Sequence, residues 1–231
     1  MPFFLKDRDE DAQEKMDDPN CDKEKLFNTY KQFSVINGLI SGWRSIYKNE
    51  IRPACNDLSR RYSLLDIGFG GGDLALKLAD WTKSDQIGME ITAIETDERA
   101  YEYVKDMSTP PNITFRQISS TALREEGQSF DFVISNHLLH HLNKGELLKL
   151  LDESKELSQK KVLFSDIERS DLGYLLFNTL SRPIFNDSFI TEDGLTSIKR
   201  SYTASELKST VPPAWKVKRK FPYRLLLRYE H

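Results

Sequence analysis

Hydrophobic positions divide the beginning of the chain into two stretches of different character. Residues 6–25 are mostly charged and contain almost no apolar side chains, which is typical of a solvated or frayed segment. In residues 26–47, apolar side chains recur mostly at spacings of three and four, so we predict an amphipathic helical region there. It forms one helix, or two helices joined near Gly38 or Gly42, and Pro53 limits how far it can continue.

Short apolar runs alternate with helical patterns between residues 60 and 170. We expect strands at residues 63–67, 90–95, 113–118, 130–135 and 161–167. We expect helices at residues 74–81, 97–107 and 143–157, the last with Asn143 as its N-cap. This alternation predicts an α/β fold in which a doubly wound, parallel sheet carries helices on both faces.

The alternation stops at residue 171. The pattern predicts a helix over residues 172–180, ended by Pro183, and then a polar loop over residues 186–200. A short helix over residues 205–210 and a terminal antiparallel hairpin of residues 215–221 and 223–229 follow.

We therefore divide the chain into two parts. Residues 1–59 form an N-terminal tail and a helical region, and residues 60–231 form the core, with residues 171–200 as an insertion.

Composition narrows the class of protein. The 231 residues carry a formal net charge of −3, which does not suit a protein that binds nucleic acid through its overall charge. No apolar run approaches the roughly 20 residues that span a bilayer, and the start lacks the pattern of a secretion signal. Because Cys21 and Cys55 form neither a disulfide framework nor a metal cluster, we expect a cytoplasmic location.

Glycines are concentrated where the first predicted strand meets the first core helix. The sequence there is Asp66-Ile67-Gly68-Phe69-Gly70-Gly71-Gly72-Asp73. A strand, a glycine turn and a helix N-terminus together form a ligand-binding crevice at the carboxyl edge of a sheet. The dinucleotide fingerprint would need a glycine at position 73, which is Asp73 here. An aspartate before the glycines suits a ligand with an ammonium or sulfonium charge, although Asp66 could instead order the loop.

These residues resemble the class I S-adenosylmethionine-dependent methyltransferases, most closely the quinone-biosynthesis and small-molecule branch. The resemblance rests on residues 64–72, 94–97, 130–136 and 139–142. It implies a Rossmann-like three-layer sandwich with seven strands in the order 3-2-1-4-5-7-6. The last strand is antiparallel, and an N-terminal helical lid covers the crevice.

The resemblance also implies a cofactor, S-adenosylmethionine. The glycine loop would cradle its methionyl part, and Glu95 would bind the ribose hydroxyls. Family members often hold the adenine amine with an acidic residue after the third strand, but this chain has serines there. The expected cofactor-binding residues are Asp66, Gly68, Phe69, Gly70, Gly72, Glu95, Thr96, Ser119, Ser120, Asn136 and His137.

Three of the four histidines follow the fourth predicted strand. Histidine can accept a proton near neutral pH, so His137, His140 and His141 are candidate catalytic residues. Packing and capping at a helix start is the alternative interpretation. We expect no metal site, because His140 and His141 are adjacent and no cysteine is near.

The acceptor is the least determined part of the prediction. An aromatic lid favours a small planar or lipophilic acceptor, aromatic or polyketide-like, that is methylated on a hydroxyl or an activated carbon. Ordinary packing of residues 26–47 against the sheet is the alternative to a lid. Candidate acceptor contacts are Phe177, Arg182, Phe185, Phe189 and Tyr202.

The sequence leaves other functions and the oligomeric state open. The basic positions between residues 216 and 228 suit the solvated face of a hairpin better than nucleic acid. Methylation of RNA or protein, a nicotinamide-dependent oxidoreductase and a non-catalytic binding module remain alternatives. The sequence also leaves a homodimer open.

Overall fold

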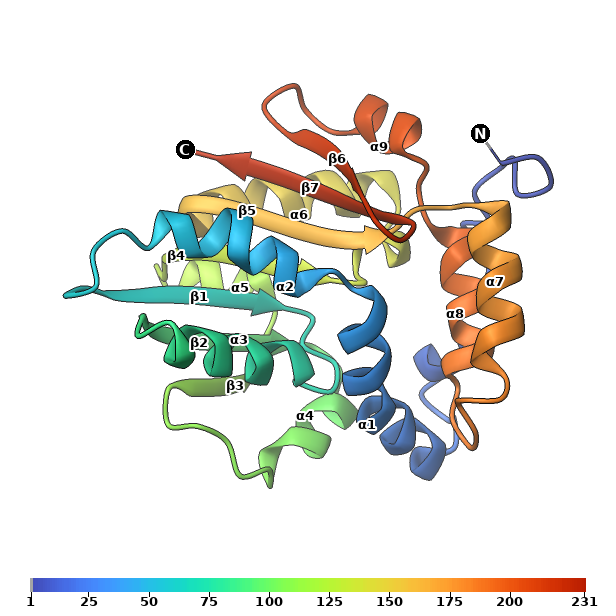
Figure 1. Cartoon of the computed structure of the whole chain (residues 1–231), viewed down its shortest axis with the longest axis horizontal. Coiled ribbons are helices and arrows are strands. Elements are labelled where there is room, and N and C mark those ends of the chain that lie inside the picture. The colour runs from blue at the N-terminus through green and yellow to red at the C-terminus, as the bar shows by residue number, and fades with distance from the viewer. Residues whose placement is uncertain (1) are drawn as a thin grey trace.

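A seven-stranded sheet forms the centre of the computed structural model, which describes residues 2–231. The strands are β1 (Arg61–Ile67), β2 (Gly88–Glu95), β3 (Ile113–Gln117), β4 (Phe130–Asn136), β5 (Ser158–Ile167), β6 (Lys216–Lys220) and β7 (Arg224–Glu230). Their order is β3-β2-β1-β4-β5-β7-β6, and only β7 runs antiparallel to its neighbours (Figure 1). The predicted fold class and strand order are confirmed.

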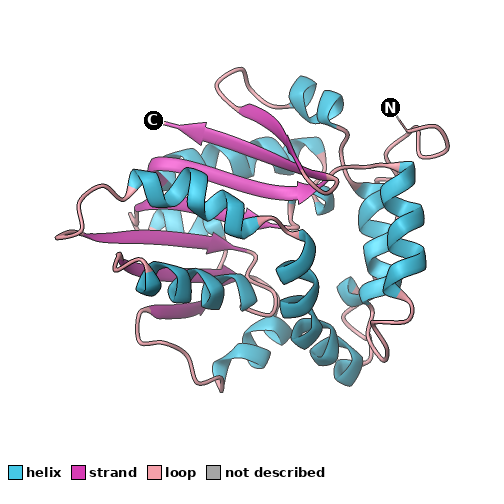
Figure 2. Cartoon of the chain, in the orientation of Figure 1, coloured by secondary structure: helices cyan, strands magenta, loops and turns pink. Residues whose placement is uncertain are grey.

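Helices cover both faces of this sheet (Figure 2). They are α1 (Lys23–Ile40), α2 (Trp43–Ile46), α3 (Asp73–Ser84), α4 (Glu98–Lys105), α5 (Ser120–Glu125), α6 (Lys144–Leu157), α7 (Asp171–Ser181), α8 (Ile190–Arg200) and α9 (Ala204–Thr210). None of the helices in the described part of the chain is long and apolar enough to cross a membrane.

Two apolar cores fill the space between the layers. One packs α1 to α4 against one sheet face and includes Leu64, while the other packs α5, α6 and α9 against the opposite face and includes Leu65. Neighbouring strand residues point to opposite faces, so adjacent leucines enter different cores. Strands covered on both sides read as continuous apolar runs, which is why the central strands could be recognised in the sequence.

The N-terminal helical region breaks where glycine allows it. Helix α1 begins at Asp22, whose side chain accepts a hydrogen bond from the Lys25 backbone N–H. It ends before Gly42, which has the left-handed φ of 71° that glycine tolerates. Helix α2 then buries Trp43, so the break predicted near Gly38 or Gly42 is confirmed at the second glycine.

Two sequence predictions are wrong. Residues 6–25 are not frayed, because the segment before α1 is held against the insertion by buried charges. The side chain of Asp193 on α8, for example, accepts from the backbone N–H groups of Lys15 and Met16. Residues 186–200 do not form a polar loop, because helix α8 occupies most of them. Its buried face mixes Ile190 and Ile198 with Asp193, Ser197 and Arg200, so the segment looks polar in the sequence although the face is buried.

Candidate active site

The glycine loop joins β1 to α3 at the carboxyl edge of the sheet. Gly68, Gly70 and Gly72 have φ values of 78°, 52° and 74°, a region that other residues rarely adopt. A Cβ atom at Gly71 would lie 2.8 Å from the backbone oxygen of Tyr30. The loop is therefore bent tightly and packed directly against α1, which only glycine permits.

Asp66 lies beneath this loop with its side chain almost completely buried. Its Oδ2 atom has no hydrogen-bond partner. Burial raises the pKa of this carboxyl to about 8, and the charges of Asp73 and Glu95 contribute. An unpartnered buried acceptor at a glycine loop is a binding position for a ligand that brings donors or positive charge.

Glu95 stands at the end of β2 and turns its carboxylate toward the glycine loop. Oε2 accepts from the Gly70 backbone N–H at 3.3 Å, and Oε1 accepts from the Thr96 N–H at 2.8 Å. A cavity of about 640 Å³ lies on one side and a second of about 240 Å³ on the other. Both are lined by Gly68, Glu95, Thr96 and Leu138, so a ligand could extend from one cavity into the other across Glu95.

Ser119 and Ser120, which the sequence analysis places near the adenine of the expected cofactor, line the smaller cavity. Ser119 caps α5, and the Ser120 hydroxyl donates to Glu153 at 2.6 Å. Glu153 is a buried carboxylate on α6 that also lines this cavity and that the sequence analysis missed. The sequence did contain a signal for it, because Glu153 is a charged residue on the apolar stripe of α6, between Leu150 and Leu157.

His137 follows β4 in a strained backbone conformation, with a φ of 59°. Its ring lies against the buried Arg224, whose Nη1 is 3.0 Å from Nε2 of His137. Arg224 also donates to Asn136 Oδ1 at 2.6 Å. Burial lowers the pKa of His137 well below its ordinary value, and the charge of Arg224 adds to this, so the imidazole is neutral at physiological pH.

His140 lies between two carboxylates. Its Nδ1 is 2.8 Å from Asp166 Oδ1, and its Nε2 is 3.2 Å from Glu14 Oε1. Burial by itself lowers the pKa of His140, but the charge of Asp166 and the hydrogen bonds to Asp166 and Glu14 outweigh it and raise the pKa to about 9. The sequence analysis missed Glu14, because it treated the N-terminal segment as solvated.

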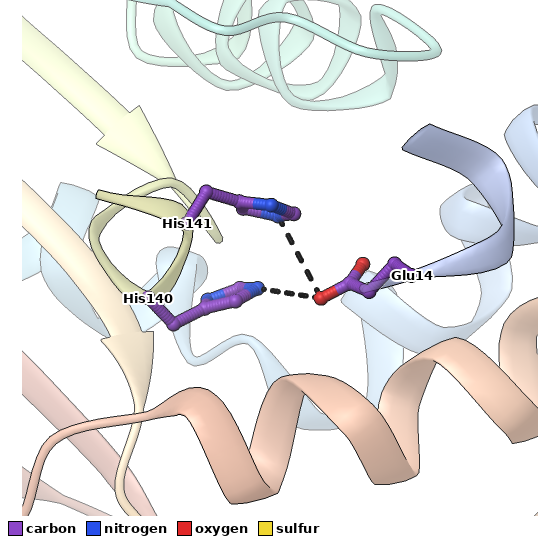
Figure 3. Close-up of side chains that lie close together, drawn as sticks. All are labelled: Glu14, His140 and His141. Carbon is purple, nitrogen blue, oxygen red and sulfur yellow. Dashed lines mark hydrogen bonds and ion pairs between the residues drawn. The ribbon is translucent and has the colours of Figure 1, made fainter. Parts of the chain in front are cut away.

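His141 is partly exposed and also faces Glu14 (Figure 3). Together with His137 and His140, it lines the larger cavity. The structure thus brings all three candidate catalytic histidines to one cavity, although their surroundings differ.

The other end of the larger cavity is apolar. Helix α1 contributes Phe33 and Leu39, while α7 and the loop after it contribute Leu180 and Ile184. Of the five predicted acceptor contacts, Phe177 and Phe185 line this cavity. The other three do not, because Arg182 bonds to Asn178 along α7, Phe189 packs in the core, and Tyr202 lies under Arg8.

Residues 64–161 match the family model described as a methyltransferase domain. This stretch is therefore assigned to a methyltransferase domain, and it makes up less than half of the chain. A search of curated protein sequences found no match.

Solved structures with the same fold are similar to this methyltransferase at low sequence identity. Human N-acetylserotonin methyltransferase in complex with S-adenosylmethionine is 15% identical with a TM-score of 0.60. The match covers 90% of this chain and 56% of that one, so this chain spans little more than half of it. The plantazolicin methyltransferase BpumL, in complex with a desmethylPZN analogue and S-adenosylhomocysteine, is 11% identical with a TM-score of 0.53, and the match covers 89% and 96% of the two chains.

The residues of the methyltransferase domain fit its cofactor, S-adenosylmethionine. The unpartnered Oδ2 of Asp66 and the glycine cradle lie beside the larger cavity, and the Glu95 carboxylate lies between the two cavities. The fingerprint argument against a nicotinamide cofactor therefore agrees with the family match.

The basic hairpin of the methyltransferase is paired with acidic residues of its own chain. Arg219 lies 2.7 Å from Glu168, and Arg228 lies 3.1 Å from Glu50, which is also 3.7 Å from Lys218. Cations that are already paired attract phosphates less strongly. This pairing agrees with the interpretation of the strands as a solvated hairpin.

Proposed function

We propose that this methyltransferase transfers the methyl group of S-adenosylmethionine to a small acceptor with a planar or lipophilic body. The reacting atom would be a hydroxyl oxygen or an activated carbon. The observation that carries the proposal is the shape of the larger cavity, which is polar at the glycine loop and apolar between α1 and α7. Such a cavity binds an apolar body and presents its polar end to a few defined groups.

In this proposal the cofactor extends across Glu95. Asp66 and the glycine loop hold its methionyl part, Glu95 binds the ribose hydroxyls, and the smaller cavity receives the adenine. Glu153 then takes the place of the acidic residue that the stretch after β3 lacks, because its carboxylate and the Ser120 hydroxyl lie at that cavity. The bound cofactor supplies a methyl group already activated by its sulfonium.

The protein has to position the acceptor and accept its proton. His137 is the candidate base in this proposal, since it is neutral and lines the cavity, and the acceptor hydroxyl would have to displace Arg224 from one of its ring nitrogens. His140 is less suited to this role, because both of its ring nitrogens already face carboxylates. Arg224 stabilises a developing negative charge near His137 by its fixed position.

The test is a methylation assay with a series of phenols and enols that carry alkyl chains of increasing length. S-adenosylhomocysteine release and product mass are the measurements. We expect kcat/KM to rise with chain length, because more apolar surface enters the cavity between α1 and α7. Leu180→Glu should remove this dependence, whereas Leu58→Glu, an exposed leucine outside the cavity, should keep it.

Methylation of an RNA or a peptide but of none of these acceptors would contradict the proposal. The cytoplasmic location and the homodimer stay predictions. Size-exclusion chromatography with light scattering tests whether the protein is a homodimer.

A further inference from the structure

Three side chains from two distant segments point toward one position at the wall of the larger cavity (Figure 3). Glu14 Oε1 lies 3.2 Å from Nε2 of His140 and 3.8 Å from Nε2 of His141. One ligand atom from each residue can be chosen so that all lie within 4.8 Å of one another. Glu14 and His140 are buried, and His141 is partly exposed.

A further carboxylate faces the other nitrogen of each imidazole. Nδ1 of His140 is 2.8 Å from Asp166, and Nδ1 of His141 is 3.3 Å from Asp17. A metal ion binds a neutral imidazole and displaces its second proton, so a ring that keeps donating from Nδ1 then turns the lone pair of Nε2 toward Glu14. Two lone pairs and a carboxylate then converge, and a cation between them satisfies all three. Pairing of histidine with an outer carboxylate is also how proteins orient metal-ligating imidazoles.

Other charged side chains near the cluster bind the backbone of the segments that carry these three residues. They do not occupy the imidazole nitrogens that face Glu14. Arg8 and Arg200 donate to the backbone carbonyls of His140 and His141, not to the imidazoles. Arg200 Nη1 also lies 3.8 Å from Asp17. On the opposite side, Asp193 accepts from the backbone N–H groups of Lys15 and Met16 and so holds the segment that carries Glu14.

We propose that Glu14, His140 and His141 bind a divalent transition-metal ion such as zinc, iron(II) or manganese(II). Two imidazoles and one carboxylate are a ligand set for such ions, whereas magnesium and calcium prefer sites made of oxygen alone. Three protein ligands leave coordination positions open, and the cluster lines the larger cavity. The ion would polarise the acceptor oxygen there. That role rests on the proposed function, but the binding site itself does not.

The test is calorimetric titration of chelator-treated, full-length protein with Zn²⁺, and separately with Co²⁺, whose visible absorption reports its ligands. We expect one ion per chain. Glu14→Gln and His141→Asn should each weaken binding by at least the roughly 10- to 100-fold that loss of an outer-shell partner costs. The matched controls Glu24→Gln and His231→Asn change exposed residues outside the cluster and should leave binding unchanged.

Two results would overturn the proposal. One is the absence of stoichiometric binding to the wild-type protein at millimolar ion. The other is undiminished binding to the double variant of Glu14→Gln and His141→Asn. Titration of the same samples with S-adenosylhomocysteine shows that each variant is folded. It also separates the metal site from the proposed function, because cofactor binding can succeed or fail independently.

Discussion

The carboxyl of Asp66 is buried under the glycine loop, where burial, Asp73 and Glu95 raise its pKa from 3.8 to about 8. The unfolded chain ionises this group at its ordinary pKa, but the folded chain resists ionisation. The contribution of Asp66 to stability is therefore fully present below about pH 4 and is lost as the pH rises toward 8. A binding residue thus lowers stability at the pH where the protein works.

Replacing Asp66 by Asn should separate these two effects. We expect Asp66→Asn to raise the free energy of unfolding at pH 8 by roughly 1–3 kcal/mol, because no charge then has to be buried. The same change should weaken S-adenosylhomocysteine binding. Urea unfolding at pH 4 and pH 8, with calorimetry of ligand binding, measures both. Equal stability gains at the two pH values would contradict the assigned pKa.

His137 provides the residue-scale test of proton transfer. General bases contribute on the order of 10²- to 10⁴-fold to rate, so His137→Asn should lower kcat within that range. His231→Asn removes a histidine far from the cavity and should leave kcat unchanged. Steady-state kinetics with the series of phenol acceptors measures the effect. A loss smaller than about threefold for His137→Asn would exclude this residue as the base.

At the scale of elements, buried charges attach the segment before α1 to the insertion, through Asp193, and to the residues that flank the insertion. The Arg169 side chain is buried, and it donates to the backbone carbonyls of Leu5, Lys6 and Ser201 and pairs with Glu206. These contacts hold in place the segment that carries Glu14. The insertion and the N-terminal segment therefore form one side of the active site together.

Arg169→Met should release this attachment. Each hydrogen bond of a charged group contributes roughly 1.5–3 kcal/mol, and Arg169 makes several buried ones, so we expect a loss of a few kcal/mol in the free energy of unfolding. Hydrogen exchange should increase in residues 3–17 before the rest of the chain. Arg182→Met, at the exposed residue directly after α7, is the control and should change stability by less than about 0.5 kcal/mol. Unchanged exchange in residues 3–17 would contradict the role of Arg169.

The elements that the sequence predicted are those with a local signal. Helix α6 begins with a capping box of Asn143 and Glu146, and its apolar stripe faces a core, so its position could be predicted. Helix α8 buries Asp193, Ser197 and Arg200 toward other polar segments, and such pairing depends on residues far along the chain. Local pattern gives no sign of long-range polar contacts.

The same reasoning applies to the candidate site. The glycine loop, Glu95 and the histidines stand next to strand ends, and that position could be predicted from the strand pattern. No local signal identifies Glu14 as the partner of His140, because the two meet only when the N-terminal segment crosses α8. Glu153 was missed for a related reason, since it reaches the smaller cavity from α6 and not from the stretch after β3.

At the scale of the whole molecule, two cavities meet at the carboxyl edge of one sheet, with Glu95 between them. In open α/β sheets this edge is where ligands bind. The N-terminal helix α1 and the insertion helix α7 line the larger cavity, so parts of the chain outside the family match contribute to it. The central claim is that one S-adenosylmethionine molecule extends across both cavities.

This claim is tested most directly by a thermal-shift titration with S-adenosylhomocysteine. Reduced nicotinamide adenine dinucleotide is the control ligand. Ligand at about 100 times its Kd adds roughly 2.7 kcal/mol, and chains of this size gain roughly 2–4 °C per kcal/mol. We predict a shift of several degrees with S-adenosylhomocysteine, a smaller one in both Glu95→Gln and Glu153→Gln, and none with the nicotinamide. A shift that Glu95→Gln and Glu153→Gln leave intact, or no shift at all, would contradict the account.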